Sequence, residues 1–209
     1  MKKKSINPFW LALSLLLSVL ILALCVFAGR GGTLRLEAEG DPQDVAVAFF
    51  YAVVAGNYRD AYACLADYSG LGLENEPDSP TGRSLSRALR ESYAFTLDGA
   101  CAVNKLEATQ RVSFRYLDVK AVEAAVAERV SDVAQALVAE RPSGEIYHEN
   151  MQYLPSFTDE VYALSLSQVL ESAADYYVTV PLDIALSYTD GVWRMKTSPA
   201  LFNALLGNA

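Results

Sequence analysis

The clearest secondary-structure pattern in the sequence is the segment YYVTVPLDIALSYTDGVWRMK, residues 176–196. Its odd-numbered positions are mostly polar or small, whereas its even-numbered positions are apolar or aromatic: Tyr176, Val178, Val180, Leu182, Ile184, Leu186 and Tyr188. Alternation with a period of two predicts a strand with one buried face. A strand of about 13 residues is much longer than the usual five or six. Pro181 has no N–H to donate to a ladder, so it indicates an edge position or a bulge within this strand.

Asp190 and Gly191 follow the long strand and form the dipeptide that is typical of a tight antiparallel hairpin. Trp193 and Met195 then alternate on the returning strand. A long strand in a small domain must twist and bend, and a bent sheet curls around the helices that cover its apolar face. We therefore expect a half-cone with a hydrophobic interior.

The rest of the chain supplies one further strand and several helices. Residues 101–119 alternate, with Leu106, Ala108, Val112, Phe114 and Tyr116 on one face. Helical spacing and capping residues, among them Asp41, Thr158 and Ser198, predict helices over residues 42–55, 58–68, 84–98, 120–140, 159–174 and 199–206. This order predicts an α+β fold in which helices cover one face of an antiparallel sheet.

The N-terminal residues predict a membrane anchor. Residues 8–28 are 21 residues without a charge, and as a helix they would span about 30 Å, the thickness of the bilayer's hydrocarbon core. Three lysines precede this stretch, which predicts that the N-terminus is cytoplasmic. We therefore expect a single-pass cell-membrane protein with the parts listed here: a cytoplasmic tail over 1–7, a transmembrane helix over 8–28, a linker over 29–40 and an extracytoplasmic domain over 41–209.

Two other interpretations of the N-terminus remain open. The small residues at 26–28 suit a cleaved secretory signal, although the apolar run exceeds the usual core of about 7–15 residues. Residues 22–25 resemble a lipoprotein cleavage site, but Leu24 is bulky for one. All three interpretations place the remaining residues outside the cytoplasm.

The charge of the chain limits the kinds of partner we expect, and its cysteine content limits the disulfides and metal sites we expect. From Leu34 onward the chain has 13 Lys and Arg (17 − 4) against 25 Asp and Glu, a net charge of −12. Such an acidic domain is a poor partner for nucleic acid, and we expect none to bind. Cys64 and Cys101 either pair in an oxidising compartment or remain two buried thiols. Neither lies in a spacing typical of zinc ligands, so we expect no metal and no cofactor.

Two motifs carry a resemblance to a known superfamily. One is G-x-Y-x-x-A-Y-x-x-L, and the other is a terminal D-G-x-W hairpin; they are matched by Gly56, Tyr58, Ala61, Tyr62 and Leu65 and by Asp190, Gly191 and Trp193. Over about residues 41–206 the chain resembles the nuclear transport factor 2-like (cystatin-like) superfamily. It is most similar to small membrane-anchored or lipoprotein-type extracytoplasmic members from Gram-positive bacteria. The resemblance implies a cone-shaped fold, although the long helices over 120–140 and 159–174 depart from the pattern and put a deep pocket in doubt.

Few residues are candidates for chemistry. Enzymes of the superfamily use an Asp or His base inside the cone, but His148 lies in a polar segment and Asp183 on the polar face of the long strand. We expect both side chains to be solvated and predict no catalytic residue. Several tyrosines on or near apolar stripes are candidates for lining a ligand pocket, with core packing as the favoured alternative: Tyr58, Tyr62, Tyr93 and Tyr116.

The favoured function is that of a membrane-anchored extracytoplasmic domain that binds a protein or a small molecule without catalysis. One alternative is an assembly subunit of an envelope or secretion machine, because the single-span subunit of type IV secretion systems has the same layout. A second alternative is an enzyme of the isomerase, dehydratase or cyclase type. A homodimer through the sheet is a further expectation that the resemblance suggests.

Overall fold

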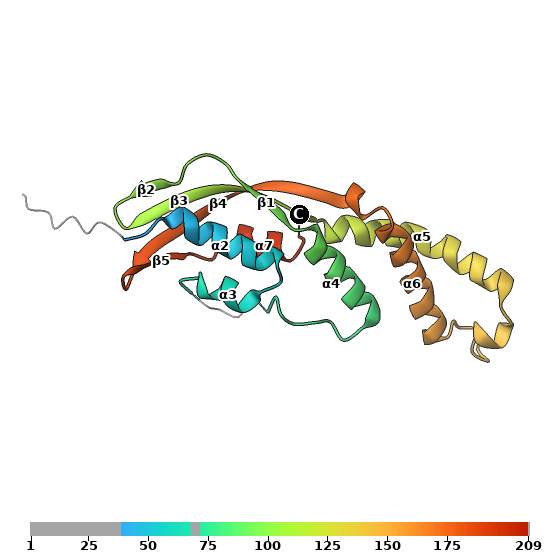
Figure 1. The fold of residues 1–209 in the computed structure, drawn as a ribbon. Coiled ribbons are helices and arrows are strands. Elements are labelled where there is room, and N and C mark those ends of the chain that lie inside the picture. The colour runs from blue at the N-terminus through green and yellow to red at the C-terminus, as the bar shows by residue number, and fades with distance from the viewer. Residues whose placement is uncertain (1–38, 68–71, 209) are drawn as a thin grey trace, which may run out of the picture. The chain divides into compact units, whose positions relative to one another are not determined.

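A computed structural model describes residues 39–67 and 72–208 (Figure 1). The chain divides into two units, residues 1–37 and 38–209, and all described residues belong to the second. The predicted cytoplasmic tail, the predicted transmembrane helix over 8–28 and most of the predicted linker therefore lie outside the described residues. Within the described part, no helix combines the length and the apolar character that crossing a bilayer requires.

One antiparallel sheet organises the unit. Its strands are β1 (Ala94–Leu97), β2 (Ala102–Asn104), β3 (Glu107–Leu117), β4 (Tyr177–Thr189) and β5 (Val192–Met195). They lie in the order β1-β3-β4-β5, and β2 pairs with β3 on the same side as β1. The sheet curls into a half-barrel that packs against helices, so the α+β class with a curled antiparallel sheet is confirmed (Figure 1).

The helices fall into two groups. The first group consists of four helices: α2 (Pro42–Val54), α3 (Tyr58–Ala63), α4 (Pro80–Ser92) and the C-terminal α7 (Pro199–Leu205). The second group lies between β3 and β4 and consists of α5 (Val119–Glu140), the short η1 (Ser143–Glu145), α6 (Pro155–Leu170) and η2 (Ala173–Tyr176). The predicted caps Asp41 and Ser198 are confirmed, because each side chain accepts a backbone N–H hydrogen bond of the first helical turn.

The alternation predicted for the two long strands is confirmed. β3 and β4 pair without a bulge from Glu107↔Ser187 to Leu117↔Tyr177. The N–H of Tyr188 donates to the carbonyl of Leu106. Backbone groups along a strand alternate in direction, so the even-numbered residues of β4 form hydrogen bonds with β3. The nitrogen of Pro181, an odd-numbered residue, therefore points away from β3. β5 pairs only with residues 186–189 and does not reach Pro181, which therefore occupies an edge.

The concave face of the sheet and the helices beneath it enclose the main core. Phe49 and Phe50 of α2 pack on Phe114 of β3, and the ring centroids of Phe50 and Phe114 are 5.4 Å apart. α7 completes this core with three buried side chains, Leu201, Ala204 and Leu205. The interior of the half-barrel is thus filled partly by the last helix of the chain.

The hairpin between β4 and β5 has the predicted geometry. Asp190 and Gly191 adopt φ values of 53° and 82°, as a type I′ turn requires, and its positive φ suits the right-handed twist of the flanking strands. Trp193 and Met195 are buried on β5 as predicted.

Three predictions for secondary structure were wrong. The helix expected over residues 84–98 begins at Pro80 and ends at Ser92, and residues 94–97 form β1 because Phe95 packs on Phe50 and the backbone pairs with β3. The single strand expected over residues 101–119 is a hairpin of β2 and β3 that turns at Lys105, where φ is 58°. α6 begins at Pro155 and has no side-chain cap, so Thr158 does not cap it.

α5 and α6 extend beyond the sheet as a helical hairpin. Its base packs on Leu117 through Val122 and Val126 of α5 and Leu166 and Val169 of α6. Residues 130–161, called the arm below, have a separate apolar cluster that contains Val133, Ile146, Phe157 and Val161. Tyr162 shares the helical spacing of the buried residues Leu166 and Val169, but it is 37% exposed on the side of α6. The far end of the arm and the start of α2 lie at opposite ends of the described unit (Figure 1).

Candidate functional site

Two of the four candidate tyrosines, Tyr58 and Tyr93, lie near Arg90 of α4. The guanidinium carbon of Arg90 is 5.5 Å from the centroid of the Tyr58 ring, within the range of a cation–π contact. The Arg90 Nη2 donates to the carbonyl of Leu73 at 3.1 Å. Burial raises the pKa of Tyr58, and the charge of Arg90 opposes part of that increase. Arg90 therefore connects α3 to the loop that follows it.

Tyr62 fixes the same loop through its hydroxyl. The hydroxyl donates to the carboxylate of Glu74 and accepts the backbone N–H of Leu73 at 2.9 Å. The hydrogen bond from Tyr62 lowers the pKa of Glu74. The hydroxyl of Tyr62 thus donates one hydrogen bond and accepts another, both within the protein. Tyr62 therefore has a structural role in addition to its predicted place in a pocket.

Tyr93 and Tyr116 point into the half-barrel, and their hydroxyls contact the C-terminal segment. The Tyr93 hydroxyl donates to the carbonyl of Leu205 at 2.5 Å, and the Tyr116 hydroxyl donates to the carbonyl of Asn208 at 3.5 Å. The ring of Phe114 lies between the two, 5.3 Å from Tyr93 and 6.0 Å from Tyr116. Burial raises the pKa of each phenol. The role of the four tyrosines as pocket lining stays a prediction.

His148 and Asp183 are solvated, as expected. His148 is exposed in the loop between η1 and α6, where its backbone N–H donates to the carbonyl of Gln152 at 2.8 Å. Asp183 lies on the outer face of β4 and forms an ion pair at 3.2 Å with Arg111, its cross-strand neighbour on β3. Both side chains are exposed to solvent.

The two described cysteines are free thiols, and each is partly buried. Burial raises the pKa of both Cys64 and Cys101, so at neutral pH they are protonated and weakly nucleophilic. In the described ranges, no group of three or more His, Cys, Asp or Glu residues is arranged to hold a metal ion.

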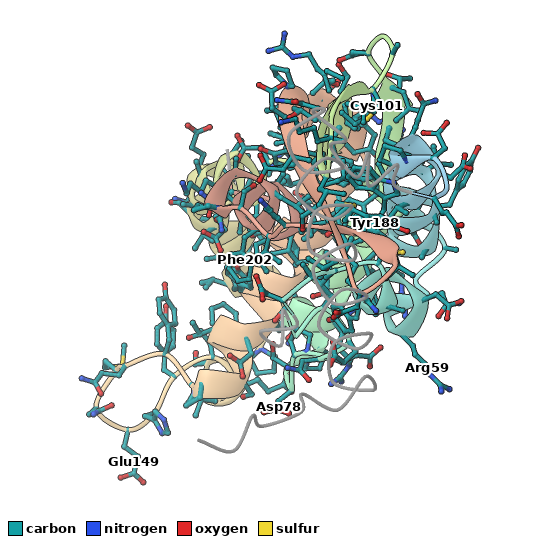
Figure 2. All side chains as sticks on the ribbon, turned by 90° about the vertical axis from the view of Figure 1, so that its left-hand side faces the viewer. Arg59, Asp78, Cys101, Glu149, Tyr188 and Phe202 are labelled. Atoms are coloured by element: carbon teal, nitrogen blue, oxygen red, sulfur yellow. The ribbon has the colours of Figure 1, made fainter. Side chains whose placement is uncertain are left out.

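The far end of the arm carries the exposed aromatic surface that sequence reasoning missed. Tyr147 and Tyr153 stack with ring centroids 5.2 Å apart, and Tyr153 stacks on Phe157 at 5.1 Å. Phe157 is buried, but Tyr153 is 50% exposed and Met151 is 73% exposed. We call residues 147–153 the tip loop. Figure 2 shows this loop, marked by Glu149, extending away from the other side chains.

Charged and backbone contacts connect the segments that support the tip loop. Arg141 at the end of α5 forms two parallel hydrogen bonds with Glu160 of α6, one of them 2.6 Å between Nη1 and Oε2. Within the loop, the backbones of residues 147 and 153 form a β-bridge, and Met151 adopts a φ of 64°. A left-handed residue with a large apolar side chain is uncommon. The Met151 side chain in this turn is exposed to solvent.

The sequence held a weak signal for this surface. The segment EIYHENMQYLPSF contains Tyr147, Met151 and Tyr153 but has neither helical nor strand periodicity, so its pattern does not indicate which of its side chains are exposed. Comparisons with known proteins give no further indication of a ligand or partner. No protein-family model matches the chain, no curated protein is significantly similar to it, and no solved structure is significantly similar to its fold.

Proposed function

We propose that this protein is a membrane-anchored, extracytoplasmic interaction domain that binds a partner protein through the tip loop of its arm, without catalysis. The observation that carries the proposal is the exposure of Met151 and Tyr153 on a rigid support. Tyrosine and methionine are enriched at protein interfaces because they bury large areas with few rotatable bonds or adapt to irregular surfaces. The partner surface should be apolar and able to accept an aromatic ring.

The placement of the tip loop supports this function. The start of α2 and the tip loop are at opposite ends of the described unit (Figure 1). The tip loop is therefore separated by the length of the described unit from the end at which α2 begins. The Arg141–Glu160 pair and the separate apolar cluster stiffen the arm, and a preorganised surface loses less entropy on binding.

Site-specific photo-crosslinking in intact cells tests the proposal. A photoreactive amino acid replaces Met151 in the full-length protein, and a matched probe replaces Gln135, which is exposed in the middle of α5. We expect a discrete adduct from position 151 that is absent from position 135. The adduct should disappear when Tyr153→Ala is combined with the probe at position 151.

Two results would contradict the proposed interaction. Equal labelling from positions 151 and 135 would indicate random collision rather than a surface that recognises a partner. An adduct from position 151 that persists in Tyr153→Ala would show that the tyrosine stack does not contribute to binding. Adducts that contain other membrane subunits would favour the alternative of an assembly subunit.

A further inference from the structure

Three arginines on one face of α4 carry positive charge in an otherwise acidic unit. Arg83, Arg87 and Arg90 are separated by four and three residues, the spacing that places side chains on the same face of a helix. With Glu91 as its only carboxylate, α4 has a net charge of +2 (3 − 1), whereas residues 34–209 together have a net charge of −12. Like charges at this spacing repel one another, so an anion bound among them would relieve the repulsion.

Neutral partners hold the guanidinium groups of Arg83 and Arg90 in place. The Nη1 atom of Arg83 donates to the carbonyl of Pro77 at 3.3 Å and to the carbonyl of Asp78 at 2.6 Å. The Nη2 atom of Arg90 donates to the carbonyl of Leu73. Hydrogen bonds to carbonyls fix the positions of the two charges but neutralise neither of them.

Carboxylates compensate the charge of these arginines only weakly. The nearest oxygen of Glu76 is 3.9 Å from Nη1 of Arg90, and the Glu76 side chain is 67% exposed. Among the residues that the structure describes, no hydrogen bond or ion pair reaches the guanidinium of Arg87. By contrast, Arg111 and Lys196 each have a nitrogen 3.2 Å from a carboxylate oxygen. The arginines of α4 therefore keep N–H donors and positive charge for a further anion.

The three arginines line one small hollow. It has a volume of about 140 Å³, and Ser86 adds a hydroxyl to its lining. Glu76 and Glu91 also line it, so its charged side chains have a net charge of +1 (3 − 2). A guanidinium presents a planar fork of N–H donors that matches the oxygen atoms of a carboxylate or a phosphate. The hollow thus suits a single oxyanion better than a polyanion.

A second, larger hollow adjoins the first. It has a volume of about 450 Å³, lies between α4 and the chain from the end of α6 to the start of β4, and shares Arg87 and Glu91 with the first hollow. Ala88 and Tyr177 give part of its lining an apolar or aromatic character. Because Glu171 also lines it, this hollow suits the uncharged part of a ligand. Its size is within the range of about 300–1,000 Å³ that is typical of small-molecule sites.

We propose that α4 binds a small organic anion, with its carboxylate or phosphate group between Arg83, Arg87 and Arg90 and its uncharged part in the larger hollow. Figure 1 shows α4 between α6 and the loop that follows α3, and these two segments supply further walls of the hollows. The site does not include the tip loop, so it adds a small-molecule ligand to the proposed interaction with a protein.

NMR titration of the isotope-labelled full-length protein in maltoside micelles tests the site. Phenyl phosphate and benzoate are the probes, and we expect saturable shifts at the backbone amides of residues 86–91. Arg87→Gln should raise the Kd of the tighter probe at least about tenfold, because it removes a charge-assisted hydrogen bond. Arg129→Gln is the matched control: it removes the same charge from an exposed position on α5 and should change the Kd by less than about twofold, because salt screens distant charges.

The head groups alone, inorganic phosphate and acetate, test the larger hollow. The tighter probe should bind at least about threefold more tightly than its head group, because its ring buries apolar area. Equal affinities would overturn the role of the larger hollow.

Three other outcomes would contradict the site itself. Equal weakening by Arg87→Gln and Arg129→Gln would indicate general attraction between charges rather than a site. The absence of saturable shifts at residues 86–91 with both probes would exclude anion binding at α4. Shifts there on addition of phosphatidylglycerol to the micelles, without shifts from either probe, would identify a lipid headgroup as the ligand and overturn the proposal of a soluble anion.

Discussion

The hydroxyl of Tyr93 donates a hydrogen bond of 2.5 Å to the main-chain carbonyl of Leu205, a residue 112 positions further along the chain. This bond joins the end of α4 to the C-terminal helix inside the half-barrel. Tyr116 contacts the carbonyl of Asn208 in the same region, and the N–H of Val119 donates to the carbonyl of Gly207 at 2.9 Å. The last residues of the chain are therefore part of the core, and they occupy space that a ligand cavity would need.

The first prediction concerns the pH dependence of Tyr93. Burial raises its pKa above the ordinary value of about 10, so the folded state holds the phenolic proton more tightly than the unfolded state does. Its stabilising contribution is complete below about pH 10 and is lost as the pH rises above that toward the folded-state pKa. We expect Tyr93→Phe to lower the free energy of unfolding by about 1–2 kcal/mol at pH 7 and to weaken its decline above pH 10. Thermal unfolding between pH 7 and pH 11.5 measures both effects, and parallel curves for the two proteins would contradict the assignment.

The second prediction concerns the docking of the C-terminus. Gly207 has a φ of 70°, and a Cβ there would lie 2.8 Å from the carbonyl oxygen of Leu117 and 2.6 Å from a methyl group of Val119. We expect Gly207→Ala to combine about 1–2 kcal/mol of left-handed strain with about 1–3 kcal/mol of overpacking. Gly191→Ala is the matched control, because Gly191 also has a positive φ but nothing lies within 4 Å of its Cβ position. Chemical denaturation should place Gly207→Ala clearly below the control, and equal stabilities would show that the C-terminus is not closely packed.

The third prediction concerns the turn between β4 and β5. A β-branched residue resists the φ of 82° that Gly191 adopts, whereas asparagine tolerates left-handed backbone. We expect Gly191→Val to lower the free energy of unfolding by at least about 1–2 kcal/mol, and Gly191→Asn to cost less. The melting temperatures of the two variants are compared with that of the unaltered chain. Indistinguishable values for Val and Asn would rule out a turn that depends on positive φ.

The fourth prediction concerns the independence of the arm. Phe157 belongs to the apolar cluster of residues 130–161, which has no residue in common with the main core. Removing its ring should cost about 3–5 kcal/mol where it packs, so Phe157→Ala should open the arm while the sheet stays folded. Hydrogen exchange should accelerate at Val133 and Ile146 and stay slow at Phe114. Phe49→Ala is the comparison variant and should accelerate exchange at Phe114; loss of protection throughout the unit in Phe157→Ala would show that the arm and sheet unfold together.

Local patterns predicted the elements whose two faces differ along many residues. β3 and β4 alternate over 11 and 13 residues, and each face keeps its character because one is in the core and the other in solvent. α5 likewise buries a stripe that includes Val122, Val126 and Val133. The turn at Asp190 and Gly191 was predictable because few residue pairs adopt its positive φ angles without strain.

The tertiary structure alone decided the elements whose identity depends on distant partners. Residues 94–97 continue the helical spacing of Leu85, Leu89 and Tyr93, yet they form β1 because the β3 edge offers backbone bonds and Phe50 offers a ring for Phe95. Four residues are too few for a periodic pattern to outweigh such contacts.

For the candidate site, too, local sequence patterns predicted one part and tertiary contacts determined the other. The sequence placed Tyr58, Tyr62, Tyr93 and Tyr116 near apolar stripes, but a phenol's hydrogen-bond partner is set by whichever group the fold brings within 3 Å or so. For Tyr93 that group is a carbonyl at the other end of the described chain, and for Tyr62 it is a carboxylate 12 residues away. Composition and periodicity determine which side chains leave water. Long-range packing determines what those side chains contact, because their partners lie on elements that are distant in the sequence, such as α7.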